Sequence, residues 1–187
     1  MNRRLFALLV AVTLAAPAAA VAATKEEKRK QVSDTPQETL ARLYKAQPKA
    51  KDAIDKAAGY AVFSNFGMKI LVAGGGKGQG LAVNKKTNAE TFMKMMEVQA
   101  GLGMGVKKFR LVWVFEKQAD LDRFINKGWE LGGQATASAK VAGQGQDLYA
   151  GAMSISPGVW LYQLTDEGVA VELTAKGTKY TKDAELN

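Results

Sequence analysis

A glycine-rich run around one lysine is the part of this sequence whose residue types could bind an anion. The run covers residues 74–80 and reads Gly-Gly-Gly-Lys-Gly-Gln-Gly, with Lys77 at its centre. Consecutive backbone N–H groups in a glycine turn can form a concavity that holds an anion, and the lysine adds a mobile positive charge. A hairpin whose glycines supply positive φ angles and allow close strand crossing is the alternative. The candidate phosphate-binding residues are therefore Lys77, Gly74, Gly75, Gly76 and Gly78.

This run does not match the nucleotide-binding motifs. A phosphate-binding loop requires Ser or Thr directly after Gly-Lys, and Gly78 stands there instead. The dinucleotide motif requires a third glycine at a fixed offset between a strand and a helix, and this segment is expected between two strands. We therefore expect no nucleotide ligand.

The chain contains neither histidine nor cysteine. Their absence removes the commonest general base, the thiolate nucleophile and nearly all transition-metal sites. The acidic residues are scattered, and couples such as Asp120 with Asp122 lie beside basic residues on expected helices, where a solvated ion pair explains them. The sequence therefore predicts a protein that is not an enzyme and needs no cofactor and no metal.

Residues 1–22 have the composition of a signal peptide. Arg3 and Arg4 precede an apolar stretch, and small residues up to Ala20 or Ala22 provide a cleavage site. The apolar stretch is short for a membrane span, and no later segment could cross a membrane as a helix. The cleavage region also lacks the cysteine of a lipoprotein. We therefore expect a periplasmic or secreted protein whose mature chain has no lipid anchor and no transmembrane helix.

The charge balance favours anionic partners. The sequence has 26 Lys and Arg residues against 18 Asp and Glu residues, for a formal net charge of +8. Lipid headgroups, nucleic acids and acidic polymers all attract such a surface, and export makes nucleic acid the least expected of them. Lys45 and Lys49 are further candidates for contact with an anionic bilayer. The alternative is a compensated solvent face, in which Lys51 pairs with Asp55 on a helix.

Two helices are expected before a sheet. Residues 23–37 are charged and lack an apolar face, which predicts a flexible leader or a frayed helix start. After Pro36, Leu40, Leu43 and Tyr44 lie at helical spacing, and a second short helix begins at Pro48. A third helix is expected around Leu121 and Phe124, with Gly128 as its C-terminal cap.

After Gly59 the apolar residues recur with a period of two, which is typical of antiparallel strands with one dry face. From Met96 to Lys107 the pattern predicts Met96 inward and Glu97 outward, and from Trp129 to Val141 it predicts another strand. The fold class is α+β, with a mainly antiparallel, strongly curved or barrel-like sheet, two N-terminal helices and one inserted helix. Further strands are expected at Tyr60–Phe66, Met68–Ala73, Gly80–Lys85, Phe109–Glu116, Leu148–Ile155, Gly158–Leu164 and Gly168–Ala175.

An ordered set of motifs resembles the SYLF domain family. These motifs are Ala58-Gly59-Tyr60-Ala61-Val62-Phe63, the 74–80 run, Gly101–Gly105, Gly128-Trp129-Glu130-Leu131-Gly132 and Asp147-Leu148-Tyr149-Ala150. The domain is expected over residues 38–182, followed by a tail at 183–187. Two departures stand out: Ser64 occupies the place of a usual proline, and residues 91–96 are rich in methionine where the family is rich in aromatics.

The resemblance implies a non-enzymatic lipid-binding domain, with an actin link in fungal and animal relatives that export excludes here. We therefore expect a cell-envelope domain that recognises anionic phospholipids or a membrane surface reversibly through lysines. The methionines, including Met96, are either core residues or the lining of a groove for acyl chains. The alternative function is a protein-interaction or structural module of the periplasm that docks a partner chain.

Overall fold

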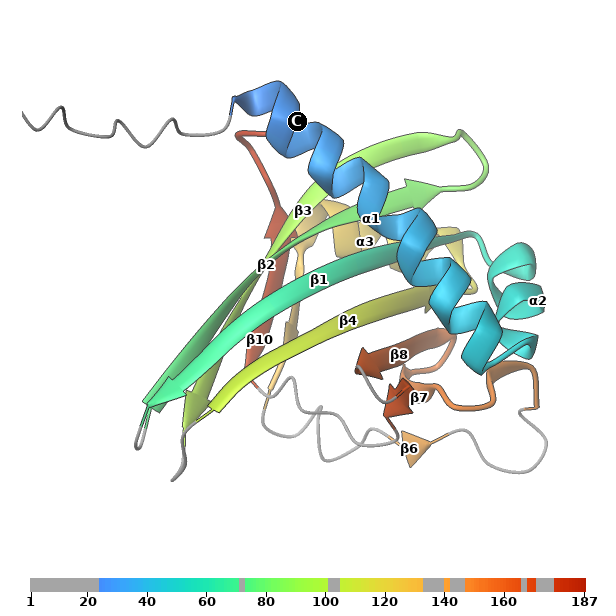
Figure 1. The fold of residues 1–187 in the computed structure, drawn as a ribbon. Coiled ribbons are helices and arrows are strands. Elements are labelled where there is room, and N and C mark those ends of the chain that lie inside the picture. The colour runs from blue at the N-terminus through green and yellow to red at the C-terminus, as the bar shows by residue number, and fades with distance from the viewer. Residues whose placement is uncertain are drawn as a thin grey trace, which may run out of the picture.

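Figure 1 shows the fold in a computed structural model, which describes residues 24–70, 73–100, 105–132, 140–141, 147–165, 168–170 and 177–187. The helices of this part are α1 (Lys25–Ala46), α2 (Lys49–Lys56) and α3 (Gln118–Lys127), with a short 3-10 turn at Asp147–Tyr149. The strands are β1 (Gly59–Ile70), β2 (Ala73–Asn84), β3 (Ala89–Ala100), β4 (Gly105–Phe115), β5 (Trp129–Leu131), β6 (Lys140–Val141), β7 (Met153–Ser156), β8 (Val159–Thr165), β9 (Gly168–Ala170) and β10 (Thr178–Lys182).

The strands form one antiparallel sheet in the order β5-β10-β3-β2-β1-β4-β8-β7-β6, with β9 paired to β8. The long central strands β1 to β4 curve together into a half-barrel (Figure 1). The expected class is thereby confirmed: α+β, with a strongly curved antiparallel sheet, two N-terminal helices and one inserted helix. Gly128 ends α3 with a φ of 76°, as the sequence indicated.

Helices cover both faces of the sheet. On one face, α3 inserts Leu121 and Phe124 into an aromatic core, where the Phe124 ring lies 5.2 Å from Trp113 and 6.1 Å from Phe63 between centroids. On the other face, α1 and α2 pack through residues such as Leu43 onto apolar side chains of β1, β4 and β8. These contacts fix α1 across the sheet and so determine which part of that face it leaves uncovered.

Residues 25–37 form the first half of α1, which agrees with the expected helix start and not with its alternative, a flexible leader. A capping box begins the helix: the Thr24 hydroxyl accepts from the Glu27 N–H at 3.2 Å, and the Glu27 carboxylate accepts from the Thr24 N–H at 2.7 Å. Val32 is buried against Phe92 and Leu186. One apolar anchor in such a charged segment is too little to produce a periodic pattern, which is why the sequence did not indicate this packing.

The glycine run lies inside β2 and not in a turn, so the expected anion-binding concavity was wrong, and its glycines do not have the positive φ angles expected for a hairpin turn. Strand β2 pairs with β1 on one side and with β3 on the other. A Cβ on Gly80 would lie 2.4 Å from Cδ1 of Phe63, and one on Gly78 would lie 2.6 Å from Cγ of Met95. These glycines leave room for large core side chains, and the expected close approach at glycine is therefore confirmed.

The expected faces of the Met96 segment are reversed. Met96 is 55% exposed, whereas Met95 and Glu97 are buried. The earlier residue Met93 already points into the core, and a continuous strand keeps one alternation, so Met95 follows it inward. The segment also divides between two strands, because β3 ends at Ala100 and β4 begins at Gly105.

Other strand expectations have mixed outcomes. The Trp129 strand is confirmed over β5, where Glu130 is exposed and Leu131 is buried, but residues 133–139 lie outside the described part. The expected strand from Leu148 begins instead with the 3-10 turn, and β7 starts only at Met153. Strand β10 was not expected from the sequence.

Candidate functional site

Cross-strand register arranges the side chains of the α1-covered face in rows. One row is fully apolar and lies beneath the helices. Each residue of this row is the direct cross-strand partner of the next. In order across β8, β4, β1, β2 and β3 they are Tyr162, Val112, Val62, Leu81 and Phe92. Apolar contacts with α1 occupy this row, since Leu43 packs at one end and Val32 at the other.

The next row of the same face is largely polar. It pairs Leu164, Arg110, Ser64, Gln79 and Lys94 in order across β8, β4, β1, β2 and β3. Two residues further along the strands, a second row on this face pairs Lys77 of β2 directly with Met96 of β3. The face therefore changes from apolar to cationic at the point where helix packing ends.

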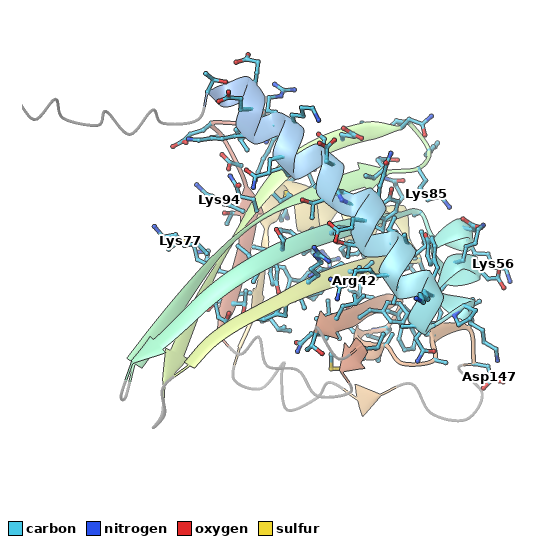
Figure 2. All side chains as sticks on the ribbon, viewed as in Figure 1. Arg42, Lys56, Lys77, Lys85, Lys94 and Asp147 are labelled. Carbon is cyan, nitrogen blue, oxygen red and sulfur yellow. The ribbon has the colours of Figure 1, made fainter. Side chains whose placement is uncertain are left out.

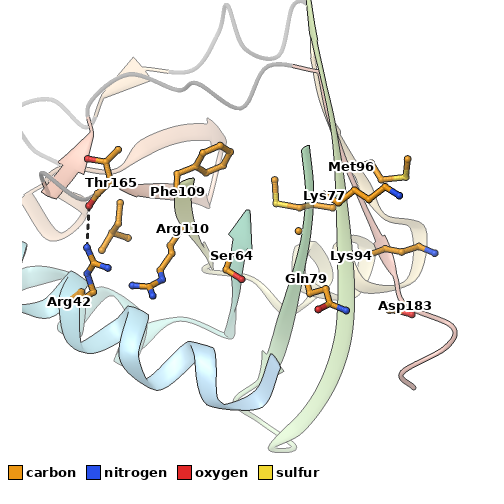
Figure 3. Close-up of a pocket in the computed structure, with 13 residues that line it drawn as sticks. Arg42, Ser64, Lys77, Gln79, Lys94, Met96, Phe109, Arg110, Thr165 and Asp183 are labelled. Carbon is orange, nitrogen blue, oxygen red and sulfur yellow. Dashed lines mark hydrogen bonds between the residues drawn. The ribbon is translucent and has the colours of Figure 1, made fainter. Parts of the chain in front are cut away.

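A cavity of about 710 Å³ lies over this polar row (Figure 3). Its volume is within the range of roughly 300–1,000 Å³ that is usual for small-molecule sites. Strand residues from the polar row and from the row of Lys77 and Met96 line it, together with Arg42 of α1. The complete lining is Arg42, Ser64, Lys77, Gly78, Gln79, Lys94, Met95, Met96, Phe109, Arg110, Leu164, Thr165 and Asp183.

Two arginines of the lining make contacts at the edge of α1. Arg110 donates from Nη2 to the Glu38 carboxylate at 2.9 Å, and the Glu38 side chain is 63% exposed. Arg42 donates from Nη2 to the Thr165 carbonyl at 3.3 Å (Figure 3). These contacts hold the helix and the sheet together beside the cavity.

The lysines of the lining are exposed and differ in this from the arginines. Figure 2 shows Lys77 and Lys94 projecting to the same side, at the end of the sheet away from Lys56 of α2. Asp183 also lines the cavity, but its carboxylate accepts from the Glu185 N–H at 3.0 Å. The arrangement therefore provides several cations with little opposing charge, which suits binding of an anion.

The structure separates the residues that the sequence analysis grouped as candidates. Lys77 and Gly78 line the cavity, whereas Gly74, Gly75 and Gly76 lie further along β2 and outside its lining. Lys45 and Lys49 lie on α1 and α2, also outside the lining.

The alternative interpretation, a compensated helix face on α2, is borne out at Lys51 and Asp55. Lys51 lies 2.6 Å from the Asp55 carboxylate. This contact raises the pKa of Lys51 and lowers the pKa of Asp55, chiefly through the side-chain hydrogen bond between them. Arg123 likewise lies 3.7 Å from Asp120 on α3.

Of the basic residues in the lining, sequence reasoning missed Arg42, Lys94 and Arg110, and it named Met96 only as one of several methionines. Lys94 alternates with buried Met93 and Met95, a pattern that could have placed it on the opposite face. Its position in a row with Arg110 depends on pairing across β1 and β2, which no local pattern reveals.

The described part of the chain also limits other kinds of site. No group of three or more His, Cys, Asp or Glu side chains in it is placed to hold a metal ion. None of its helices combines the length and apolar character needed to span a bilayer.

A helix-covered antiparallel half-barrel with a cation-lined cavity defines an α+β binding domain. A family model described as "Ysc84: Las17-binding protein actin regulator" matches residues 96–187. Beta cell expansion factor A of Aeromonas veronii is 33% identical to this chain over 164 residues, which is 87% of this chain. The chain belongs to the SYLF, or Ysc84, domain family, as its motifs indicated. It spans 60% of the length of that curated relative.

Proposed function

We propose that this domain binds lipids at a membrane surface, with anionic headgroups in contact with Lys77 and Lys94 at the cavity. The observation that carries the proposal is the common direction of these two exposed lysines (Figure 2), together with the exposed Met96 opposite Lys77 (Figure 3). This function is non-enzymatic. Family membership supports a binding domain, and the residues of contact are our inference.

The two lysines and the methionine fit a bilayer surface physically. Each lysine near an anionic surface contributes about 1 kcal/mol of attraction, which falls off within a Debye length. Met96 offers a flexible apolar side chain that can enter the boundary between headgroups and acyl chains. Lys45 and Lys49 lie outside the lining that contains Met96, so we assign them a smaller contribution to binding.

Co-sedimentation with vesicles tests this proposal. The vesicles are phosphatidylcholine alone or phosphatidylcholine mixed with phosphatidylglycerol, at low and high salt. We expect salt-sensitive binding to the anionic vesicles only. The Lys77→Glu/Lys94→Glu double variant should bind at least about ten-fold more weakly, since two attractive charges become repulsive.

The matched control is Lys45→Glu/Lys49→Glu, which changes the net charge equally on α1 and α2. An equal loss in both double variants would mean that total charge, and not the cavity, determines binding. No binding to any vesicle would contradict lipid recognition and favour the alternative, a module that docks a partner chain on the face bearing Met96.

We also infer that residues 1–22 are removed on export to the periplasm or the medium. The basic start, the apolar stretch and the small residues before Ala23 support this inference. Expression in a bacterial host followed by intact-mass measurement should show a chain that begins at about residue 21 or 23. Recovery of the complete chain from the cytoplasm alone would contradict export.

A further inference from the structure

Arg110 has a hydrogen-bonding capacity that the described residues do not use. Its Nη2 bonds to Glu38, whereas Nη1 is buried and has no hydrogen-bond partner in the described part of the structure. The side chain is 24% exposed and lines the cavity (Figure 3). A buried guanidinium nitrogen without an acceptor is costly, so this atom marks a place where an oxygen would bind favourably.

The surroundings of Arg110 define the kind of oxygen group that fits. Its neighbours in register are Ser64 on one side and Leu164 on the other. Lys94 lies three strands away in the same row, at about 14 Å by the usual strand spacing, so the lysines reach a different part of a ligand. Guanidinium groups favour planar, bidentate contacts with carboxylate or phosphate.

The partner that Arg110 already has is easily replaced. Glu38 approaches from α1 with a side chain that is 63% exposed, and exposed ion pairs contribute little to stability. It engages one nitrogen of the guanidinium, whereas a ligand carboxylate or phosphate can engage two. Glu38 is thus an internal competitor for the position of a ligand anion.

We propose that Arg110 binds the anionic oxygen group of a single-chain amphiphile inside the cavity, and that this group displaces Glu38. Met96 and Leu164, at opposite sides of the polar rows, provide the apolar lining that the acyl chain requires. This inference rests on the proposed lipid-binding function and narrows it, because it places one lipid molecule inside the protein in addition to headgroups at its surface.

Titration with monomeric ligands tests the inference, by calorimetry and below the critical micelle concentration. The probes are palmitate and lysophosphatidic acid, which share an anionic group on one chain, and inorganic phosphate, which has no chain. Glu38→Gln should bind both amphiphiles about two- to five-fold more tightly, since the competing charge is removed. Arg110→Gln should weaken binding by about ten-fold or more. Inorganic phosphate should bind at least about ten-fold more weakly than either amphiphile.

The control is Glu26→Gln, which removes the same charge from the exposed first turn of α1. Tighter binding in Glu38→Gln but not in Glu26→Gln supports the displacement of Glu38. Unchanged or weaker binding in Glu38→Gln overturns it, even if Arg110→Gln fails to fold. Equal binding of phosphate and the amphiphiles would also overturn it, because the site would then recognise a free anion.

The same variants separate this inference from the proposed function. If wild-type protein sediments with anionic vesicles but binds neither palmitate nor lysophosphatidic acid, the inference fails and surface recognition of lipid stands. If the protein binds no vesicle, the proposed function fails, and the calorimetric comparison of Glu38→Gln with Glu26→Gln alone decides whether Arg110 binds an amphiphile.

Discussion

Gly78 and Gly80 illustrate how much a single residue's size matters in this sheet. The space that a Cβ would need at these positions is occupied by Met95 and by Phe63. The glycine run thus serves the core on one face of β2, while Lys77 and Gln79, between the glycines, serve the cavity on the other. Alternation along the strand thus directs Lys77 and Gln79 to the face opposite Phe63 and Met95, although Gly78 also borders the cavity.

Tyr162 gives a prediction at the residue scale. This side chain of β8 is fully buried, and within the described residues its hydroxyl has no hydrogen-bond partner. Burial raises its pKa to about 12, compared with about 10 in an unfolded chain. The folded state therefore retains the proton longer, so stability that is fully present below pH 10 is lost as the pH rises from about 10 to 12.

We expect Tyr162→Phe to make that decline shallower, by up to about 1.4 kcal/mol per pH unit. At pH 7 its free energy of unfolding should be within about 1 kcal/mol of wild type, because no hydrogen bond is lost. Urea unfolding at pH 7, 10, 11 and 12 measures both values. Parallel pH profiles for the two proteins would contradict the burial of the neutral phenol.

At the scale of elements, α1 contacts both the apolar row and the polar row of one sheet face. Its C-terminal half packs on the apolar row through Leu43, and its N-terminal half packs on β2 and β3 through Val32. Glu38 and Arg42, between these anchors, contact the sheet beside the cavity. The position of the cavity is therefore a consequence of where the helix is anchored.

Val32 gives a prediction at this scale. Val32→Ala should lower the free energy of unfolding by about 1–3 kcal/mol, because it removes buried methyl groups from contact with Leu81, Phe92 and Leu186. It should also increase hydrogen exchange in residues 25–37. The control Lys28→Ala changes an exposed residue of the same segment and should have little effect. Equal stability of the two variants would contradict the docking of this half of α1.

Strand β3 shows how two local patterns can conflict. Met93 and Met95 predict one inward face, whereas Met96, Val98 and Ala100 predict the other. Both cannot hold in a continuous strand, and the pockets left by Gly78 and Gly80 favour Met93 and Met95. Exposure of Met96 follows from this choice and places an apolar side chain beside Lys77.

At the scale of the whole molecule, periodicity was enough to predict the class of fold. The change to a period of two after Gly59 and the helical spacing around Leu43 and Phe124 correspond to observed elements. The candidate site was predicted through Lys77 and Gly78, with Met96 named only as one of several methionines. Arg110 and Lys94 share one row of the sheet because β1 and β2 pair between their strands, and such long-range pairing leaves no local signal. The docking of residues 183–187 is equally non-local.

Residues 183–187 join the beginning of α1 to strand β3, and this affects the order in which the protein folds. The Asn187 side chain both donates to the Phe92 carbonyl, at 2.8 Å, and accepts from its N–H, at 3.0 Å, as a neighbouring strand would. Lys25 in turn donates to the Asn187 carbonyl at 3.4 Å, across 162 positions of sequence. On the ribosome, the beginning of α1 emerges long before these partners exist. The contacts of α1 with Leu186 and Asn187 therefore form late in folding, after its contacts with Leu81 and Phe92 have become possible.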